Sequence, residues 1–167
     1  MTLTRCSLFC FFLLIFSISQ AQSDSLRPPY LLNKSIPSFK IMQAPDSIVF
    51  SSTELKSNLS TIFFVFNPDC EFCQHETRDL IQNIKKFKNT QIIMVSYMPF
   101  DMIREFYSEY KIGKYPIIMG KDNDYLFLKF FKLKILPSTI VYDSTGKFKK
   151  IFRERVDVDV LLKEVEN

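Results

Sequence analysis

The stretch TIFFVFNPDCEFC, residues 61–73, decides the fold. Residues 61–66 are β-branched or aromatic without polar alternation, which is typical of a strand buried on both faces of a sheet. Asn67-Pro68-Asp69 breaks the strand. From residue 70 to residue 88 apolar side chains, Phe72 and Leu80 among them, recur near one helical stripe. The sequence therefore predicts a buried strand followed directly by a helix that begins at a cysteine.

Further strands and helices follow this stretch. Residues 91–96 and 138–142 are apolar runs that predict buried strands, and residues 100–110 and 158–165 have helical spacing. Residues 147–152 come after a glycine-bearing turn and predict a hairpin partner for the strand before them. This order predicts an α/β sandwich, with a mixed central β-sheet flanked by helices on both faces.

The N-terminus has the pattern of an export signal. Arg5 precedes an apolar run at residues 8–18, and Ser19-Gln20-Ala21 places small residues where a signal peptidase cleaves. The run is shorter than the roughly 20 residues that span a bilayer. We therefore expect a signal peptide over residues 1–21 and a periplasmic or secreted mature protein. An uncleaved N-terminal membrane anchor is the alternative.

The remaining chain has the composition of one globular domain. Of 167 residues, 47% are hydrophobic and 24% charged, which excludes a disordered protein. The net charge of +4 is spread along the chain, so a nucleic-acid surface is not expected. The 3 glycines are too few for a phosphate-binding loop. We expect a flexible, proline-bearing leader at residues 22–37 and a single domain at residues 38–167.

Cysteine usage points to redox chemistry. Removal of the signal peptide leaves only Cys70 and Cys73. A disulfide between them would close too short a loop to stabilise a domain much, so a structural role explains the pair poorly. Tetrahedral zinc takes about four ligands, and the mature chain offers this pair and His75. We therefore expect no metal and no cofactor.

The placement of the pair predicts its mechanism. A helix that begins at Cys70 turns unpaired backbone N–H groups and the positive end of its dipole toward that sulfur, which favours the nucleophilic thiolate. Cys73 lies one turn further along, shielded but near enough to attack a sulfur bonded to Cys70. We therefore predict a two-step thiol–disulfide exchange in which Cys70 attacks and Cys73 resolves the mixed disulfide.

Two motifs carry a family resemblance. Residues 63–73 resemble the strand–CxxC–helix opening of the thioredoxin superfamily, and residues 136–146 resemble its cis-proline loop, strand and hairpin turn. The export signal and the stretch at residues 38–41 are most similar to TlpA-type periplasmic thioredoxins, which also resemble thiol-specific antioxidant (AhpC/TSA-like) proteins. The resemblance covers residues 38–167 and implies a thioredoxin-like fold.

The resemblance also implies how substrate binds. Pro137 would be cis and lie against the cysteine pair, and the backbone of Leu136 would pair with substrate as a β-strand does. Aromatic side chains around the pair would add an apolar contact. We therefore take Leu136, Pro137 and Phe72 as candidate substrate-binding residues.

The sequence departs from the thioredoxin pattern around the cysteines. Asp69 replaces the usual tryptophan, Phe72 the usual proline, and Phe64 the buried acid that aids proton transfer in many thioredoxins. The proton of the resolving cysteine must therefore leave through water or another group, and Glu71 or Glu76 is nearest. Acidic residues near a helix start are also common for dipole reasons alone.

Negative charge flanks the nucleophile. Asp69 and Glu71 lie on either side of Cys70, and like charge disfavours a thiolate. We therefore expect the pair to be comparatively reducing.

The resemblance implies an exported thiol–disulfide oxidoreductase that reduces protein disulfides, with electrons from a membrane donor of the DsbD or CcdA type. Cell redox homeostasis and cytochrome c maturation are roles that fit it. We expect a monomer with no nucleic-acid partner. A peroxiredoxin-like peroxidase is one alternative, although Asn67 replaces the Thr or Ser that this chemistry needs three residues before its cysteine. A non-catalytic binding module or a Sco-type copper chaperone is the other; the latter separates its cysteines by three residues.

Overall fold

The computed structural model describes residues 27–166. The predicted signal peptide at residues 1–21 lies outside the described residues. Among the helices that are described, none is long and apolar enough to cross a membrane.

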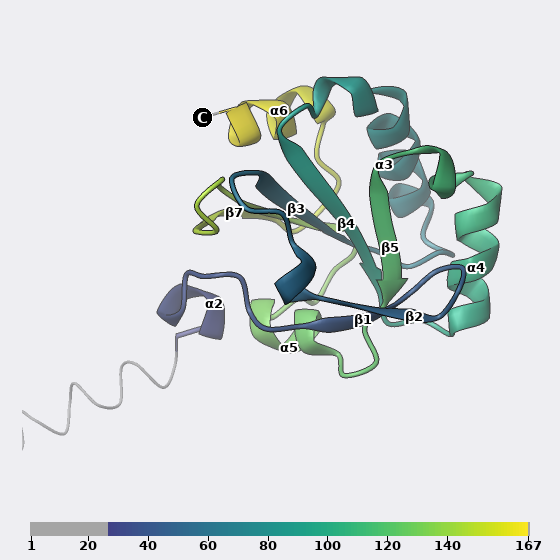
Figure 1. Ribbon diagram of the computed structural model, residues 1–167, viewed down its shortest axis with the longest axis horizontal. Helices are drawn as coiled ribbons and strands as arrows, with labels where there is room; N and C mark the ends of the chain where they lie inside the picture. Colours follow the sequence, from purple (N-terminus) through teal and green to yellow (C-terminus); the bar gives the residue numbers. More distant parts are fainter. Residues whose placement is uncertain (1–26, 167) are drawn as a thin grey trace, which may run out of the picture.

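A single mixed sheet of seven strands forms the centre of the described structure, in the order β2-β1-β5-β4-β3-β6-β7 (Figure 1). β3 pairs in parallel with β4 and antiparallel with β6, so the strand that leads to the cysteine pair lies inside the sheet. All of its residues are buried. The strands are β1 (Lys40–Gln43), β2 (Ile48–Ser51), β3 (Ser60–Val65), β4 (Thr90–Ser96), β5 (Ile117–Lys121), β6 (Ser138–Tyr142) and β7 (Phe148–Phe152).

Helices cover both faces of the sheet, which confirms the predicted fold class (Figure 1). One face packs against α3 (Glu71–Gln82), α4 (Phe100–Glu109) and α6 (Val158–Glu166). The other packs against α2 (Pro29–Leu32) and α5 (Leu126–Phe131). Three short 3-10 helices complete the described elements: η1 (Ser52–Glu54), η2 (Ile84–Lys86) and η3 (Ile112–Lys114).

Aromatic packing dominates the face that carries α5. Phe63 of β3 contacts Phe39, Phe127 and Tyr142, with ring centroids 5.1 to 5.9 Å apart. Two of these pairs, with Phe39 and with Tyr142, are edge-to-face, the arrangement that aromatic quadrupoles favour. Residues 61–66 therefore anchor both hydrophobic layers, because Phe63 points into this one and Phe64 into the one beneath α3.

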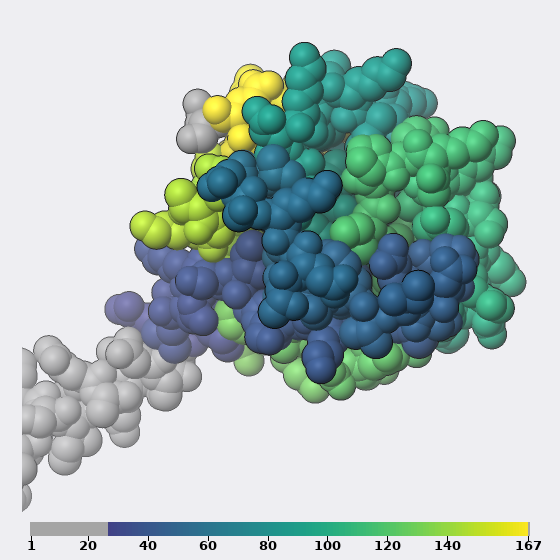
Figure 2. Space-filling view, in the orientation of Figure 1, coloured from purple at the N-terminus to yellow at the C-terminus, as the bar shows by residue number. Residues whose placement is uncertain are grey.

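The N-terminal part of the described chain differs from expectation. The segment predicted as a flexible leader contains α2, whose Tyr30 is buried with its ring 5.0 Å from that of Phe148. Ser35 forms an isolated bridge with Lys147. The β1–β2 hairpin was not expected either. Figure 2 shows this N-terminal region, in purple and blue, packed across the lower part of the face in view.

We expect Phe63→Ala to lower the free energy of unfolding by about 3–5 kcal/mol, because it removes a fully buried ring from an aromatic cluster. Urea unfolding of the reduced protein measures the change. Phe72→Ala is the matched control: its ring is 63% exposed, so the change should stay below about 0.5 kcal/mol. Equal losses for the two variants would contradict this account of the core.

Candidate functional site

A tight turn joins β3 to α3 and positions the first cysteine. The side-chain oxygen of Asn67 accepts a hydrogen bond from the Asp69 N–H at 3.0 Å, and its carbonyl accepts one from the Cys70 N–H at 3.1 Å. Gln74 reaches back to donate to the carbonyl of Pro68 at 2.9 Å. Five residues, 66–70, thus separate the buried strand from the helix, with Cys70 at the N-cap position.

The Cys70 sulfur has two close backbone contacts. It accepts a hydrogen bond from the backbone N–H of Cys73 at 3.4 Å, as an N-cap side chain does. It also donates to the carbonyl of Leu136 at 3.7 Å. The residue is half-buried. A sulfur at this point can reach a partner molecule while a helix N-terminus faces it.

Cys73 lies one turn further along α3 and has no exposed surface. Both cysteines are free thiols. Burial raises the pKa of the Cys73 thiol far above its ordinary value, and its hydrogen bond with Cys70 and the nearby charges of Cys70 and Glu76 act in the same direction. Cys73 therefore holds its proton until a nearby base accepts it.

The loop that contains Pro137 lies against Cys70, as the resemblance implied. The Leu136–Pro137 peptide bond is cis, and the Leu136 carbonyl is the group that Cys70 contacts. Ile135, one residue earlier, is 62% exposed. The hydroxyl of Ser138 donates to the Ile135 carbonyl at 2.8 Å, which fixes the backbone of the loop.

Phe72 does not belong to the apolar face of α3, contrary to the prediction. Its side chain is 63% exposed. Instead, the inward face of the helix consists of Cys73, Glu76, Thr77 and Leu80. These positions follow i, i+3, i+4 and i+7 spacing from the second cysteine, and the exposed position of Phe72 leaves its ring available to a ligand.

Glu76 is a buried carboxyl directly beneath the pair. It is 1% exposed and lies one turn after Cys73 on the same helix face. The hydroxyl of Thr139 donates to its Oε1 at 2.6 Å, and the backbone N–H of Val156 donates to its Oε2 at 3.3 Å. Glu71, the other acid that the sequence suggested, is exposed, as is His75.

Burial sets the ionisation of this carboxyl. It raises the pKa of Glu76 from 4.5 to about 7, against the opposing effects of the Thr139 and Val156 hydrogen bonds and the positive charge of Arg155. Arg155 is held nearby by an ion pair with Asp79 at 2.9 Å. A carboxyl with this pKa can accept or release a proton near neutral pH.

Glu76 was only one of two acids that the sequence suggested, and Thr139 was not among the predicted site residues. The helical spacing from Cys73 was the available signal for Glu76. No sequence signal pointed to Thr139, because it is 63 residues away from Glu76 in sequence. Only the folded sheet brings it next to α3. It pairs with Phe64 across the β3–β6 pairing.

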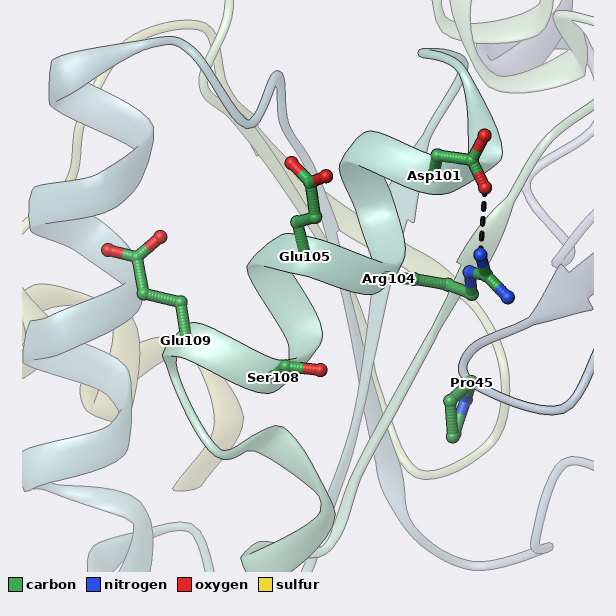
Figure 3. A pocket seen from close by; sticks show the side chains of 6 residues that line it. All are labelled: Pro45, Asp101, Arg104, Glu105, Ser108 and Glu109. Atoms are coloured by element: carbon green, nitrogen blue, oxygen red, sulfur yellow. Dashed lines mark hydrogen bonds and ion pairs between the residues drawn. The ribbon is translucent and has the colours of Figure 1, made fainter.

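A hollow of the surface lies apart from this site. It is formed by α4 and Pro45, and Figure 3 shows Asp101, Glu105 and Glu109 along the helix with Arg104 paired to Asp101 at 3.0 Å. Neither Cys70 nor Cys73 lines it, and nor does the loop that contains Pro137. Across residues 27–166 no cluster of three or more His, Cys, Asp or Glu residues could hold a metal ion.

A family model described as AhpC/TSA family matches residues 32–151. The chain belongs to this family. Among curated proteins, none matches the sequence significantly. This AhpC/TSA-family chain has a thioredoxin-like fold, like the solved structures that it resembles.

Three of those structures cover most of the domain. The chain is similar to the thioredoxin domain of a thiol-disulfide oxidoreductase from Bacteroides vulgatus, with TM-score 0.63 and 20% identity over 79% of this chain and 93% of that one. It is also similar to a secreted Mycobacterium tuberculosis disulfide oxidoreductase, with TM-score 0.63 and 16% identity over 77% of this chain and 94% of that one. For a peroxiredoxin-like protein from Aquifex aeolicus the TM-score is 0.66 and the identity 12%, over 80% of this chain and 84% of that one. At these identities the likeness is one of fold.

Glu76 should make stability depend on pH. Its pKa is raised from 4.5 to about 7, so the folded chain binds the proton more tightly than the unfolded chain does. The resulting stabilisation is complete below the unfolded pKa and is lost as the pH rises through the folded one. We expect a loss of up to about 3 kcal/mol from this group, measured by urea unfolding of the reduced protein between pH 5 and pH 8.

Glu76→Gln should remove most of that pH dependence, because an amide cannot ionise. Glu71→Gln is the control, since Glu71 is an exposed acid on the same helix. The explanation is wrong if the Glu76→Gln variant loses as much stability as the wild type over this pH interval.

Proposed function

We propose that this protein is an exported thiol–disulfide oxidoreductase that reduces disulfide bonds in other proteins. The placement of the two sulfurs carries the proposal. Cys70 is half-buried at the start of α3, and Cys73 is buried one turn behind it with its N–H aimed at the Cys70 sulfur. A reachable nucleophile with a shielded resolving thiol is what two-step exchange requires.

The exchange conserves atoms and electrons. The Cys70 thiolate attacks one sulfur of a substrate disulfide, forms a mixed disulfide and releases the other sulfur as a thiolate, which takes up a proton. Cys73, on losing its proton, attacks the Cys70 sulfur and releases the second substrate thiolate, which is also protonated. The substrate gains two electrons and two protons, and the pair ends as a Cys70–Cys73 disulfide.

Glu76 is the base that we assign to the second step. Burial raises the pKa of Cys73, so the resolving thiol needs an acceptor for its proton. Glu76 is on the same inward face of α3, and burial raises its own pKa to about 7. Its carboxylate can thus take up the proton near neutral pH and pass it to the departing substrate thiolate or to water.

Substrate contacts come from the loops around Cys70. The Leu136 carbonyl faces the sulfur and, with Pro137, offers backbone to an extended chain. Two exposed apolar side chains lie next to these groups in sequence: Phe72 precedes Cys73, and Ile135 precedes Leu136. A polypeptide segment with an apolar residue near its cysteine fits these contacts.

Export and the electron source complete the proposal. Residues 1–21 have the pattern of a signal peptide, and one similar structure is that of a secreted disulfide oxidoreductase. A reductase outside the cytoplasm must be recharged after each cycle, since disulfides persist there. A membrane electron donor of the DsbD or CcdA type is the partner that we assign to this step.

Peroxide reduction is the second candidate function, favoured by the likeness to a peroxiredoxin-like protein. The turn before Cys70 argues against it. Asn67 holds the position where that chemistry needs Thr or Ser, and its side-chain oxygen already accepts the Asp69 N–H. Position 67 therefore has no hydroxyl group that could orient a peroxide beside the Cys70 sulfur.

Reduction of insulin disulfides with dithiothreitol as electron source tests the first candidate. We expect clear turnover by the wild type and none by Cys70→Ser, because the nucleophile is lost. Cys73→Ser should accumulate a mixed disulfide with substrate at Cys70, visible as a mass that dithiothreitol removes. Peroxide-dependent oxidation of thiols without insulin reduction would instead establish the peroxidase. Inactivity in both assays would leave a binding module.

The acids beside Cys70 should lower its reduction potential. Asp69 and Glu71 are both exposed, so their effect on the thiolate is screened by water. We expect the double variant Asp69→Asn/Glu71→Gln to raise the potential by about 10–20 mV, since neutral side chains favour the reduced, thiolate-bearing form. Equilibration with glutathione measures it.

Glu105→Gln, on α4, removes an equal charge outside the site and is the control. An unchanged potential in the double variant would refute the charge argument. A wild-type potential near that of DsbA, about −120 mV, would refute the assignment as a reductase.

A further inference from the structure

A single buried hydrogen bond links the two halves of the candidate site. Thr139 lies on β6 two residues after the cis-proline, and Glu76 lies on α3 one turn after Cys73. Thr139 has no exposed surface, Glu76 is 1% exposed, and the Thr139 hydroxyl donates to Glu76 Oε1 at 2.6 Å. Short hydrogen bonds to a carboxylate in a buried setting are among the stronger ones in proteins.

This bond decides which carboxylate oxygen is available. Oε1 accepts the Thr139 hydroxyl at 2.6 Å, whereas Oε2 has only a longer contact of 3.3 Å with the backbone N–H of Val156. While Oε1 is occupied in this way, Oε2 is the oxygen freer to take up a proton. The bond also restrains rotation of a side chain that would otherwise choose among several rotamers.

The charged and titratable groups that act on Glu76 come from two parts of the chain. From α3 these are Asp79, one turn further along, and Cys73 itself, and from the segment after β7 it is Arg155, which Asp79 holds at 2.9 Å. The neighbouring strand β6 contributes no charge, only the Thr139 hydroxyl. The hydroxyl is therefore the partner whose removal changes no other charge in the site.

We propose that Thr139 is a positioning residue for the exchange: its hydroxyl orients the Glu76 carboxylate and keeps it ionised, so that Glu76 accepts the proton of Cys73 during resolution of the mixed disulfide. The inference rests on the proposed function. Thr139 does not contact the substrate. It acts on the attack of Cys73 from β6, the strand that directly follows the substrate-binding loop.

The inference predicts a specific pH effect. Without the hydroxyl, the Glu76 carboxylate loses its closest hydrogen bond, and the neutral acid becomes relatively more favourable. Since a hydrogen bond to an ionised group shifts a pKa by about one unit, Thr139→Val should raise the pKa of Glu76 by about one unit. The pH midpoint for resolution should then move toward alkaline pH by the same amount. Thr139→Ser, which keeps a hydroxyl, should restore the wild-type midpoint.

Two measurements on the reduced full domain test this. The first is the titration of the Glu76 carboxyl by carbon-13 NMR, which requires no turnover. The second is a single-turnover reaction with oxidised glutathione from pH 5 to pH 9, quenched in acid. Mass then separates the Cys70–glutathione mixed disulfide from the resolved Cys70–Cys73 disulfide, so the resolving step is followed on its own.

Thr61→Val is the matched control. Thr61 is a buried threonine on β3, and its hydroxyl accepts from Gln91 at 2.9 Å, far along the strand from the cysteines. It should lose a comparable buried hydrogen bond and leave both the Glu76 titration and the pH midpoint of resolution unchanged. A general loss of packing would move the two variants alike.

The outcomes separate the two proposals. Alkaline shifts of both titration and midpoint in Thr139→Val, with rescue in Thr139→Ser, support the inference. If Thr139→Val shifts the Glu76 titration but not the pH midpoint of resolution, the inference is overturned and the oxidoreductase function stands. The same holds if the Glu76 titration does not shift. If the wild type forms neither the mixed disulfide nor the Cys70–Cys73 disulfide at any pH, the proposed function fails and takes the inference with it, even though the NMR titration still shows whether the hydrogen bond tunes Glu76.

Discussion

The turn between β3 and α3 is the constraint on which the site depends. β3 is buried and paired on both sides, so its end cannot shift without breaking the sheet. Asn67 then closes the turn with two hydrogen bonds and delivers Cys70 to the N-cap of the helix. The position of the Cys70 sulfur is thus set by a strand that is buried and paired on both sides.

The buried carboxyl of Glu76 lies on a different element from the acid that many thioredoxins bury. Phe64 fills the place on β3 where many thioredoxins have a buried acid, and Glu76 approaches the same layer from α3. The cost of burying a carboxyl is offset by Thr139, Val156 and the charge of Arg155. Two segments of the chain, β6 and residues 155–156, thus converge on one side chain of α3.

Local pattern explains which parts of the fold the sequence could predict. Residues 61–66 and 138–142 are apolar throughout because both faces of those strands are covered, so their runs stood out. The β1–β2 hairpin was missed because β2 is an edge strand with a mixed exposure pattern. Phe72 was misplaced because helical spacing alone does not say which face turns inward. The bond between Glu76 and Thr139 is a tertiary contact that no local window contains.

The unequal exposure of the two sulfurs provides a direct way to follow the opening of α3. The chain has no tryptophan to report on folding. A maleimide reagent reaches the half-buried Cys70 in the reduced protein, whereas Cys73 is covered on all sides. Each folded molecule therefore takes one label and gains a second only when the first turns of the helix unfold. In a chain that starts at Gln22, and so lacks Cys6 and Cys10, the ratio of singly to doubly labelled protein measures that opening by mass alone.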